Sequence, residues 1–329
     1  MNCLLDFDNT QANTPRMKVR ALPSAFMLGL MCIGAVTAGL QHPAAPPQLP
    51  VPPVHLTRSE IEIYKWAQTL TDWTPRQVQD CPFLHKLRPA VNQHQLPMVL
   101  ERVGQTATIL FRDFPRISCD EEVISERYRG RRYVSKHHFR YIVIPRPVGD
   151  VLSFEEYRTD LEGNPLDASS LSDLIMITAN YVSTWLYLSP ADQHDSHFRY
   201  FGIQPILNRE CHVVGFAQDP ERVQSVGELR IGEKSAALLV QGLAWFDSQS
   251  FQVLRITTWL LAPRDDIDLS STNSTVDFHP VQPSGSDRVL WLPRDVTVGV
   301  FYRGIQIRNT HHYSNFKLFR VESTIKPGR

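Results

Sequence analysis

The chain has 329 residues, 42% of them hydrophobic and 21% charged, which indicates a globular protein and excludes a disordered one. Its 34 basic residues balance its 34 acidic residues, so the formal net charge is zero. The chain as a whole therefore lacks the basic excess of nucleic-acid-binding proteins, and we expect no nucleic-acid partner.

Residues 1–38 predict a secretory signal peptide. Basic residues precede an apolar stretch over 21–40, and Val36-Thr37-Ala38 has small residues at the two positions that signal peptidase reads. Translation is expected to start at Met1 or at Met17. The alternative is an uncleaved membrane anchor, because about twenty residues can just span a bilayer. We expect an exported protein, periplasmic or secreted, with the anchored form as the alternative.

A Pro-rich linker follows over residues 39–56. Six prolines between positions 43 and 53 favour polyproline geometry and cannot support a helix. We interpret this segment as a spacer in front of the folded part.

Residues 57–115 predict a helical N-terminal part. Thr57 and Glu60 form a capping pattern at the start of a run that is compatible with a helix up to Leu70. A second helix is predicted over Leu96–Phe114, where apolar residues recur at helical spacing until Pro115. Its apolar stripe is expected to pack on a sheet, with a membrane or a partner as the alternative.

Residues 116–329 predict an antiparallel β domain with a helical insertion near 168–190. Arg116–Arg129 and Arg132–Pro145 form a hairpin that turns at Gly130, and no βαβ alternation follows. The further predicted strands are Leu152–Asp160, a strand beginning at Phe198, His212–Phe216, Glu228–Ile231, Lys234–Phe246, Phe251–Ala262, Asp295–Tyr302 and Ile305–Ile325.

The late strands are apolar on both faces. In Lys234–Phe246, Ala244 and Phe246 point to one side while Leu243 and Trp245 point to the other. Both faces then need cover, so one packs on the helices and the other lines a cavity or meets another layer. The candidate cavity residues are Trp245, Trp259 and Phe301. The alternative is that all three are ordinary core aromatics.

A family resemblance appears in the same region. Gln241–Asp247 followed by Phe251–Ile256 resembles a hairpin of periplasmic lipoprotein carriers of the LolA/LolB type. Val99–Ile325, with the pattern His312–Phe319 near its end, resembles an uncharacterised, acidobacterial-type family of secreted soil-bacterial proteins. The carrier resemblance implies an α+β fold in which a curved antiparallel sheet, a LolA-like half-barrel, wraps on helices. It also implies an apolar concavity for acyl chains. The insertion Asp160–Gln193 departs from the carriers.

No metal, cofactor or catalytic residue is predicted. His194 and His197, with Asp192 and Asp195 beside them, are suitable ligand types, but no third ligand is identifiable. The chain contains no G-x-S-x-G motif, no protease cysteine motif and no Gly-rich phosphate loop. The alternative is an exported hydrolase whose site includes His194, His197 or Glu155.

Adjacent pairs of titratable residues on strands are expected to diverge. Neighbouring side chains on a strand point to opposite faces, so a pair cannot act on one substrate or metal. We predict solvated or half-buried positions for these pairs, which are Glu121-Glu122, Glu155-Glu156, His137-His138 and His311-His312.

One local cluster is strongly basic. It lies at the predicted Gly130 turn, and its candidates for binding an anionic surface are Arg129, Arg131 and Arg132. The alternative is a charged hairpin tip that prevents edge-to-edge pairing.

Three cysteines remain after signal cleavage, namely Cys81, Cys119 and Cys211. They are compatible with one disulfide and one thiol, or with three buried thiols.

The combined hypothesis is a non-catalytic exported protein that binds an apolar ligand, such as lipid or lipoprotein acyl chains, in the concave face of a curved sheet. Its partners would be lipid or lipoprotein, and a membrane surface. The alternatives are an exported enzyme and a surface-attached interaction module.

Overall fold

The chain divides into two compact units, Met1–Pro52 and Pro53–Arg329, and the second holds every residue that the computed structural model describes. The predicted signal peptide and most of the linker and helical insertion lie outside the described residues. No helix in the described part is long and apolar enough to cross a membrane. The structure describes residues 56–112, 116–148, 151–164, 183–223, 227–231 and 234–318.

Short helices form the N-terminal part. The predicted capping box of Thr57 and Glu60 is present, but the helix that it starts ends at Tyr64, earlier than Leu70. The long amphipathic helix begins at Leu96, as predicted, and extends to Arg112. The elements are α1 (Arg58–Tyr64), η1 (Leu70–Asp72), α2 (Pro75–Gln79), η2 (Pro82–Leu84) and α3 (Leu96–Arg112), followed later by η3 (Ser183–Leu188), η4 (Gln193–Asp195) and η5 (Asp265–Ile267).

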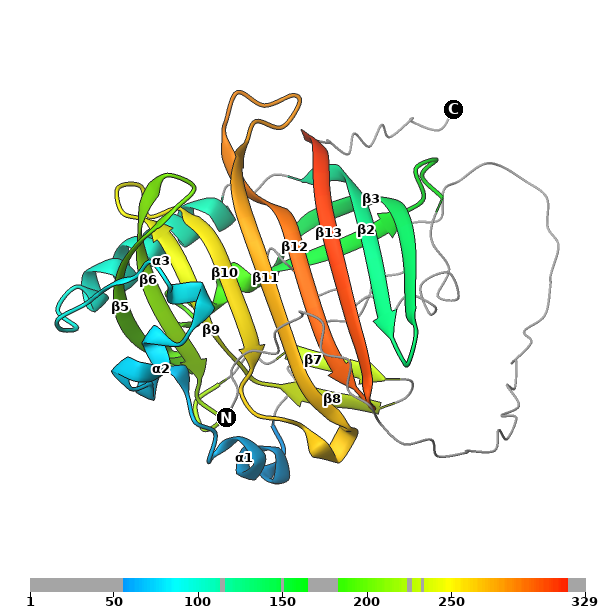
Figure 1. Ribbon diagram of the computed structural model, residues 1–329. Helices are drawn as coiled ribbons and strands as arrows, with labels where there is room; N and C mark the ends of the chain where they lie inside the picture. The colour runs from blue at the N-terminus through cyan, green and yellow to red at the C-terminus, as the bar shows by residue number, and fades with distance from the viewer. Residues whose placement is uncertain are drawn as a thin grey trace, which may run out of the picture. The chain divides into compact units, whose positions relative to one another are not determined.

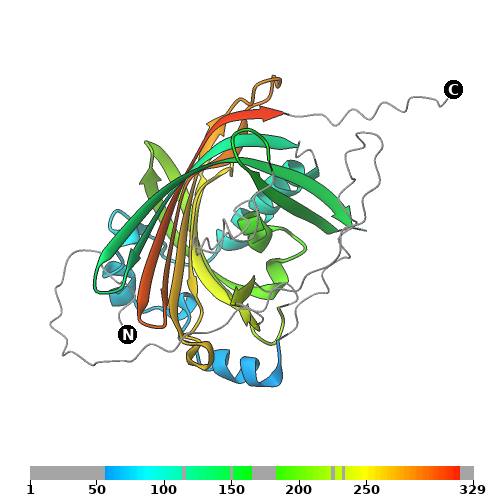
Figure 2. The ribbon, with the colours of Figure 1, turned by 90° about the vertical axis from the view of Figure 1, so that its right-hand side faces the viewer.

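The main sheet has eleven strands in the order β1-β5-β6-β9-β10-β11-β12-β13-β2-β3-β4, and every neighbouring pair is antiparallel. Its strands are β1 (Arg88–Pro89), β2 (Ile117–Tyr128), β3 (Arg132–Val148), β4 (Val151–Thr159), β5 (Ser196–Ile206), β6 (Arg209–Gln218), β9 (Val240–Asp247), β10 (Val253–Leu260), β11 (Leu269–Val281), β12 (Leu290–Tyr302) and β13 (Ile305–Leu318). The sheet is open, because its end strands β1 and β4 do not pair with each other. It is also strongly curved (Figures 1 and 2). The predicted α+β class with a curved antiparallel sheet is confirmed.

Helices cover the sheet on both faces. α3 lies inside the curve, which we call the inner face, while α2 lies on the opposite, outer face (Figures 1 and 2). Val99, Val103 and Ala107 of α3 join one apolar core with the inner face. Trp73 and Val78 join a second core with the outer face. The prediction of a sheet that is apolar on both sides is therefore confirmed.

Gly242 allows β9 and β10 to lie close together. A Cβ atom at this position would lie 2.3 Å from the carbonyl oxygen of Thr257 and 2.8 Å from the ring of Phe216. Only glycine avoids both contacts, which explains the glycine in this hairpin.

The prediction of one continuous strand over Lys234–Phe246 is wrong, because this segment forms two strands. It consists of β8 (Lys234–Leu238), which pairs only with β7 (Gly227–Ile231) in a separate sheet, and of β9 in the main sheet. At the junction, the hydroxyl of Tyr64 donates to the carbonyl of Ala237 (3.2 Å) and accepts from the N–H of Leu239 (3.3 Å). A side chain thus satisfies backbone groups that a continuous strand would pair with its neighbour.

Strand β11 was not predicted. Its first half, Leu269–Thr275, is rich in serine and threonine and shows no apolar alternation. Both of its edges are nevertheless paired, with β10 and with β12. Hydroxyls also bond across strands, as between Thr258 and Ser274 (2.7 Å). Pairing on both sides, rather than local pattern, makes this segment a strand.

Candidate functional site

The inner face carries a row of residues that we call the inner row, with one residue from each of nine neighbouring strands. Its members, in the order of the sheet, are Tyr200, Val214, Ala244, Ile256, Val276, Val296, His311, Val123 and His137. The five members on β6, β9, β10, β11 and β12 are aliphatic and at most 1% exposed. The row becomes polar only on β13 and β3. The inner face is therefore a continuous apolar surface with a polar end.

A buried carboxylate forms the polar end of this face. Glu121 of β2 accepts hydrogen bonds from Arg158 of β4, with Nε 2.5 Å from Oε2 and Nη2 2.9 Å from Oε1. From β13, His311 Nδ1 and the Tyr313 hydroxyl each lie 2.8 Å from Oε1. The Arg158 guanidinium also lies 4.9 Å from the ring centre of Tyr141. We call these residues the Glu121 cluster.

The cluster holds a charge in an apolar environment. The side chains of Glu121 and His311 are 0% exposed. Burial acts to raise the pKa of Glu121, but the hydrogen bond from His311 and the charge of Arg158 outweigh it and lower the pKa to about 2. Burial also raises the pKa of the neighbouring Cys119 thiol, which is therefore a poor nucleophile. Glu121 stays ionised at neutral pH, paired within the protein.

The predicted solvation of Glu121 and His311 is wrong, because both are buried and bonded to each other. The predicted divergence of adjacent residues is confirmed for His311 and His312, since His312 is exposed and bonds to Asp295 (2.7 Å). A signal for Glu121 exists in the sequence, because it occupies an inward position in the alternation of β2. The contact with His311 could not be found, because it depends on the pairing of β2 with β13.

The three aromatic candidates lie away from the inner face. Trp245 is fully buried in the outer core, and its indole N–H donates to Gln204 (3.2 Å). Trp259 packs on the same core, with its ring 5.6 Å from that of Phe83. Phe301 is half-buried and adjacent to the inward Val300, so it points to the outer face. Their role as ligand contacts stays a prediction, and other residues line the inner face.

His194 and His197 bind different carboxylates. His194 lies 2.9 Å from Asp195, and His197 lies 3.1 Å from Asp219. Within the described ranges, no group of three or more histidine, cysteine or acidic residues could hold a metal. The side chain of Glu155 is outside the described part.

The cysteines are buried thiols, with no disulfide among the three that the structure describes.

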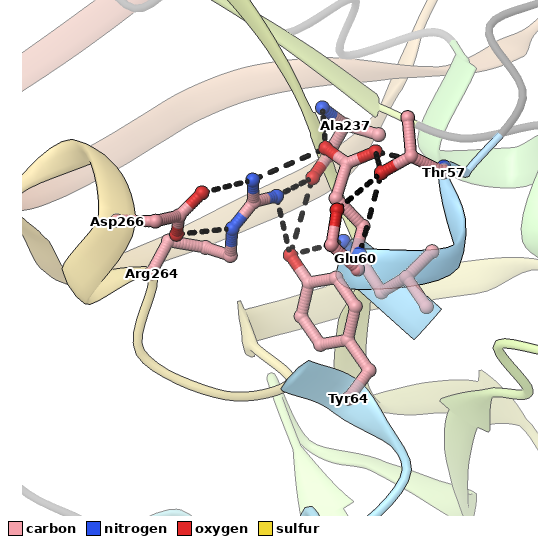
Figure 3. Close-up of polar contacts among 8 residues, drawn as sticks. Thr57, Glu60, Tyr64, Ala237, Arg264 and Asp266 are labelled. Atoms are coloured by element: carbon pink, nitrogen blue, oxygen red, sulfur yellow. Dashed lines mark hydrogen bonds and ion pairs between the residues drawn. The ribbon is translucent and has the colours of Figure 1, made fainter. Parts of the chain in front are cut away.

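Arg264 organises a second buried polar cluster, which positions α1 (Figure 3). Its guanidinium donates twice to Asp266 (2.8 and 2.7 Å) and once to Glu60 of α1 (3.1 Å). It also contacts the hydroxyl of Tyr64 (3.4 Å) and the carbonyl of Ala237. The hydrogen bond from Arg264 lowers the pKa of Asp266. All donors of this side chain point to protein groups, so the cluster has a structural role.

Fold and inner face together define an α+β protein with an open, curved antiparallel sheet and an apolar concave surface. No family model matches the chain, and a search of curated proteins finds no match. Among solved structures, the chain is similar to a domain assigned to outer membrane lipoprotein-sorting proteins from Vibrio parahaemolyticus. The TM-score is 0.40 at 11% identity, over 67% of this chain and 91% of that one.

Two further solved structures are similar. A DUF1329 family protein from Desulfovibrio piger has a TM-score of 0.38 at 11% identity, over 69% of this chain and 94% of that one. A LolA superfamily protein from Nitrosomonas europaea has a TM-score of 0.33 at 12% identity, over 70% and 96% of the two chains. The resemblance to a soil-bacterial family stays a prediction.

Proposed function

We propose that the protein is a non-catalytic, exported binding protein that holds an apolar ligand, such as a lipid or the acyl chains of a lipoprotein, against the inner face of its sheet. The observation that supports this proposal best is the inner row, whose aliphatic members run without interruption across five strands. Export rests on the signal-peptide pattern in residues 1–38.

The width of the inner face supports the proposal. Neighbouring strands lie about 4.8 Å apart, so nine strands span roughly 40 Å. A helix with its side chains is only about 10–12 Å across, so α3 covers this width together with other segments, among them Leu188 of η3. Because the aliphatic members of the inner row are at most 1% exposed, a long apolar chain would contact them in place of the protein segments that now cover them.

The polar groups of the Glu121 cluster are bonded to one another, and this supports a ligand that is bound through apolar contacts. Glu121 already accepts bonds from Arg158, His311 and Tyr313, and it has no proton to donate at neutral pH. This arrangement favours a ligand that is bound by apolar contact over a substrate that needs acid–base chemistry.

The proposal can be tested with protein purified without detergent. Native mass spectrometry is expected to show co-purified lipid, and delipidated protein is expected to bind a fluorescent fatty-acid analogue. Val298→Thr makes the inner face more polar and should weaken this binding roughly fivefold, because about one methyl group of apolar contact is lost.

The matched control is Thr297→Val, which lies on the same strand but points to the outer face. It should bind the analogue like the parent protein. Protein that carries no lipid and does not bind the analogue would contradict the proposal. Equal weakening by both substitutions would show that the inner face is not the binding surface.

A further inference from the structure

The hairpin between β2 and β3 ends in a basic tip. Gly130 turns the chain with a φ of +71°, and the N–H of Arg129 donates to the carbonyl of Arg131 (3.1 Å). Between positions 126 and 132 the chain has four arginines and one glutamate. Arg129 and Arg131 are both exposed at the turn. The tip therefore concentrates positive charge in a protein whose formal net charge is zero.

Basic residues further along these two strands are paired with carboxylates, whereas two arginines at the tip are not, within the residues that the structure describes. Arg132 pairs with Glu126, and Lys136 pairs with Glu122 (2.8 Å). In the part of the chain that the structure describes, neither Arg129 nor Arg131 pairs with a carboxylate. Of the three residues predicted to bind an anionic surface, these two have guanidinium groups available for a partner.

Apolar side chains project beside the two arginines. Tyr133 is 62% exposed and Val134 is 55% exposed. They are consecutive on β3, so they point to opposite sides of the hairpin. The tip thus presents an aromatic ring on one side of the basic turn and an aliphatic group on the other side. A turn that only keeps the protein soluble would not need either group.

We propose that this tip docks on the surface of an anionic lipid bilayer. Arginine binds phosphate oxygens with two parallel hydrogen bonds, so Arg129 and Arg131 suit phospholipid head groups. Tyrosine is favoured at the depth of the head groups, and Val134 adds apolar contact with the acyl boundary.

A nucleic-acid partner is less consistent with the same observations. Single strands bind on grooves with successive stacking aromatics, whereas this tip has Tyr133 as its one exposed aromatic residue among the described residues 126–136.

The test uses protein beginning at Gly39, so that the apolar stretch before it cannot bind lipid itself. This protein keeps the whole compact unit Pro53–Arg329 and its apolar cores. It is mixed with phosphatidylcholine vesicles, with and without phosphatidylglycerol, and bound protein is measured by flotation. We expect binding only when phosphatidylglycerol is present, and weaker binding as salt is added.

The double variant R129E/R131E should weaken binding to phosphatidylglycerol vesicles by tenfold or more. Tyr133→Ser should weaken it severalfold without changing the charge. The matched control is R58E/K86E, which changes the net charge by the same amount at two exposed basic residues of the N-terminal part. This control should bind like the parent protein, and circular dichroism checks the folding of each variant.

Equal loss in R129E/R131E and R58E/K86E would overturn the proposal, since binding would then follow net charge alone. Absence of vesicle binding by the folded parent protein would also overturn it. The proposal would likewise be overturned if the protein bound a single-stranded oligonucleotide but not vesicles, and if R129E/R131E abolished that binding. These results do not depend on ligand binding at the inner face, so this proposal and the proposed function can fail separately.

Discussion

Glu121 is an ionised carboxylate whose side chain is completely buried between strands of the inner face. Its charge is compensated by Arg158 from β4 and by hydrogen bonds from β13, so three non-sequential strands meet at this one residue. Buried ion pairs add little net stability compared with apolar contacts, but the loss of one partner leaves an unpaired buried charge. The residue is therefore sensitive to substitution.

We predict that Glu121→Gln lowers the free energy of unfolding by about 3–5 kcal/mol, because it leaves the Arg158 guanidinium buried without a counter-charge. Urea denaturation measures this value. The matched control is Glu122→Gln, the next residue, whose ion pair with Lys136 is at the surface. The control should change stability very little. Equal effects of both substitutions would contradict the role of the Glu121 cluster.

The lowered pKa of Glu121 predicts that the free energy of unfolding depends on pH. The pKa of Glu121 is lowered from 4.5 to about 2 in the folded protein, so its contribution to stability is complete above pH 4.5. The contribution is lost as the pH falls from about 4.5 to about 2. The difference in unfolding free energy between the parent protein and Glu121→Gln should therefore shrink across this window. A constant difference would show that Glu121 is not held ionised by its partners.

At the scale of elements, Arg264 joins α1 to β8. Its side chain is only 2% exposed, and its bonds join Glu60 of α1 to the backbone of β8. Lysine cannot reproduce these contacts, because it lacks the planar fork of donors of arginine.

We predict that Arg264→Lys releases α1 while the main sheet stays folded. Amide hydrogen exchange should become at least tenfold faster in Arg58–Tyr64, with little change in β12 and β13. Arg303→Lys is the control, because Arg303 pairs with Asp268 at the exposed surface. If exchange in α1 were the same in both variants, Arg264 would not be what positions this helix.

At the scale of the whole molecule, the apolar inner face of the open sheet is the surface proposed to bind an apolar ligand. A ligand that binds only the folded protein raises stability by about 2.7 kcal/mol at a hundredfold excess over its Kd. We therefore predict that a long-chain fatty acid raises the Tm of delipidated protein by several degrees. Val298→Thr should reduce this increase, and calorimetry measures both. Without any shift at saturating fatty acid, the proposed binding face would lose its support.

Local patterns were sufficient for most elements of the fold. The capping residues Thr57 and Glu60, the spacing of apolar residues in α3 and the Gly130 turn each act through neighbours in the chain. Such signals depend on residues only a few positions apart, so they can be read without knowledge of the fold. The alternation in β9 likewise predicted a sheet that needs cover on both faces.

Tertiary structure alone decided the rest, because the relevant contacts join distant parts of the chain. β11 is a strand because both edges are paired. β8 separates from β9 where Tyr64 accepts from the N–H of Leu239 and donates, like Arg264, to the carbonyl of Ala237 in β8. Glu121 and His311 are 190 positions apart and meet only because β2 pairs with β13. The sequence patterns by themselves determined an antiparallel sheet that is apolar on both faces, and its curvature was expected from the carrier resemblance. Strand order determined which polar residues that sheet buries, since burial of a charge depends on partners that no local pattern contains.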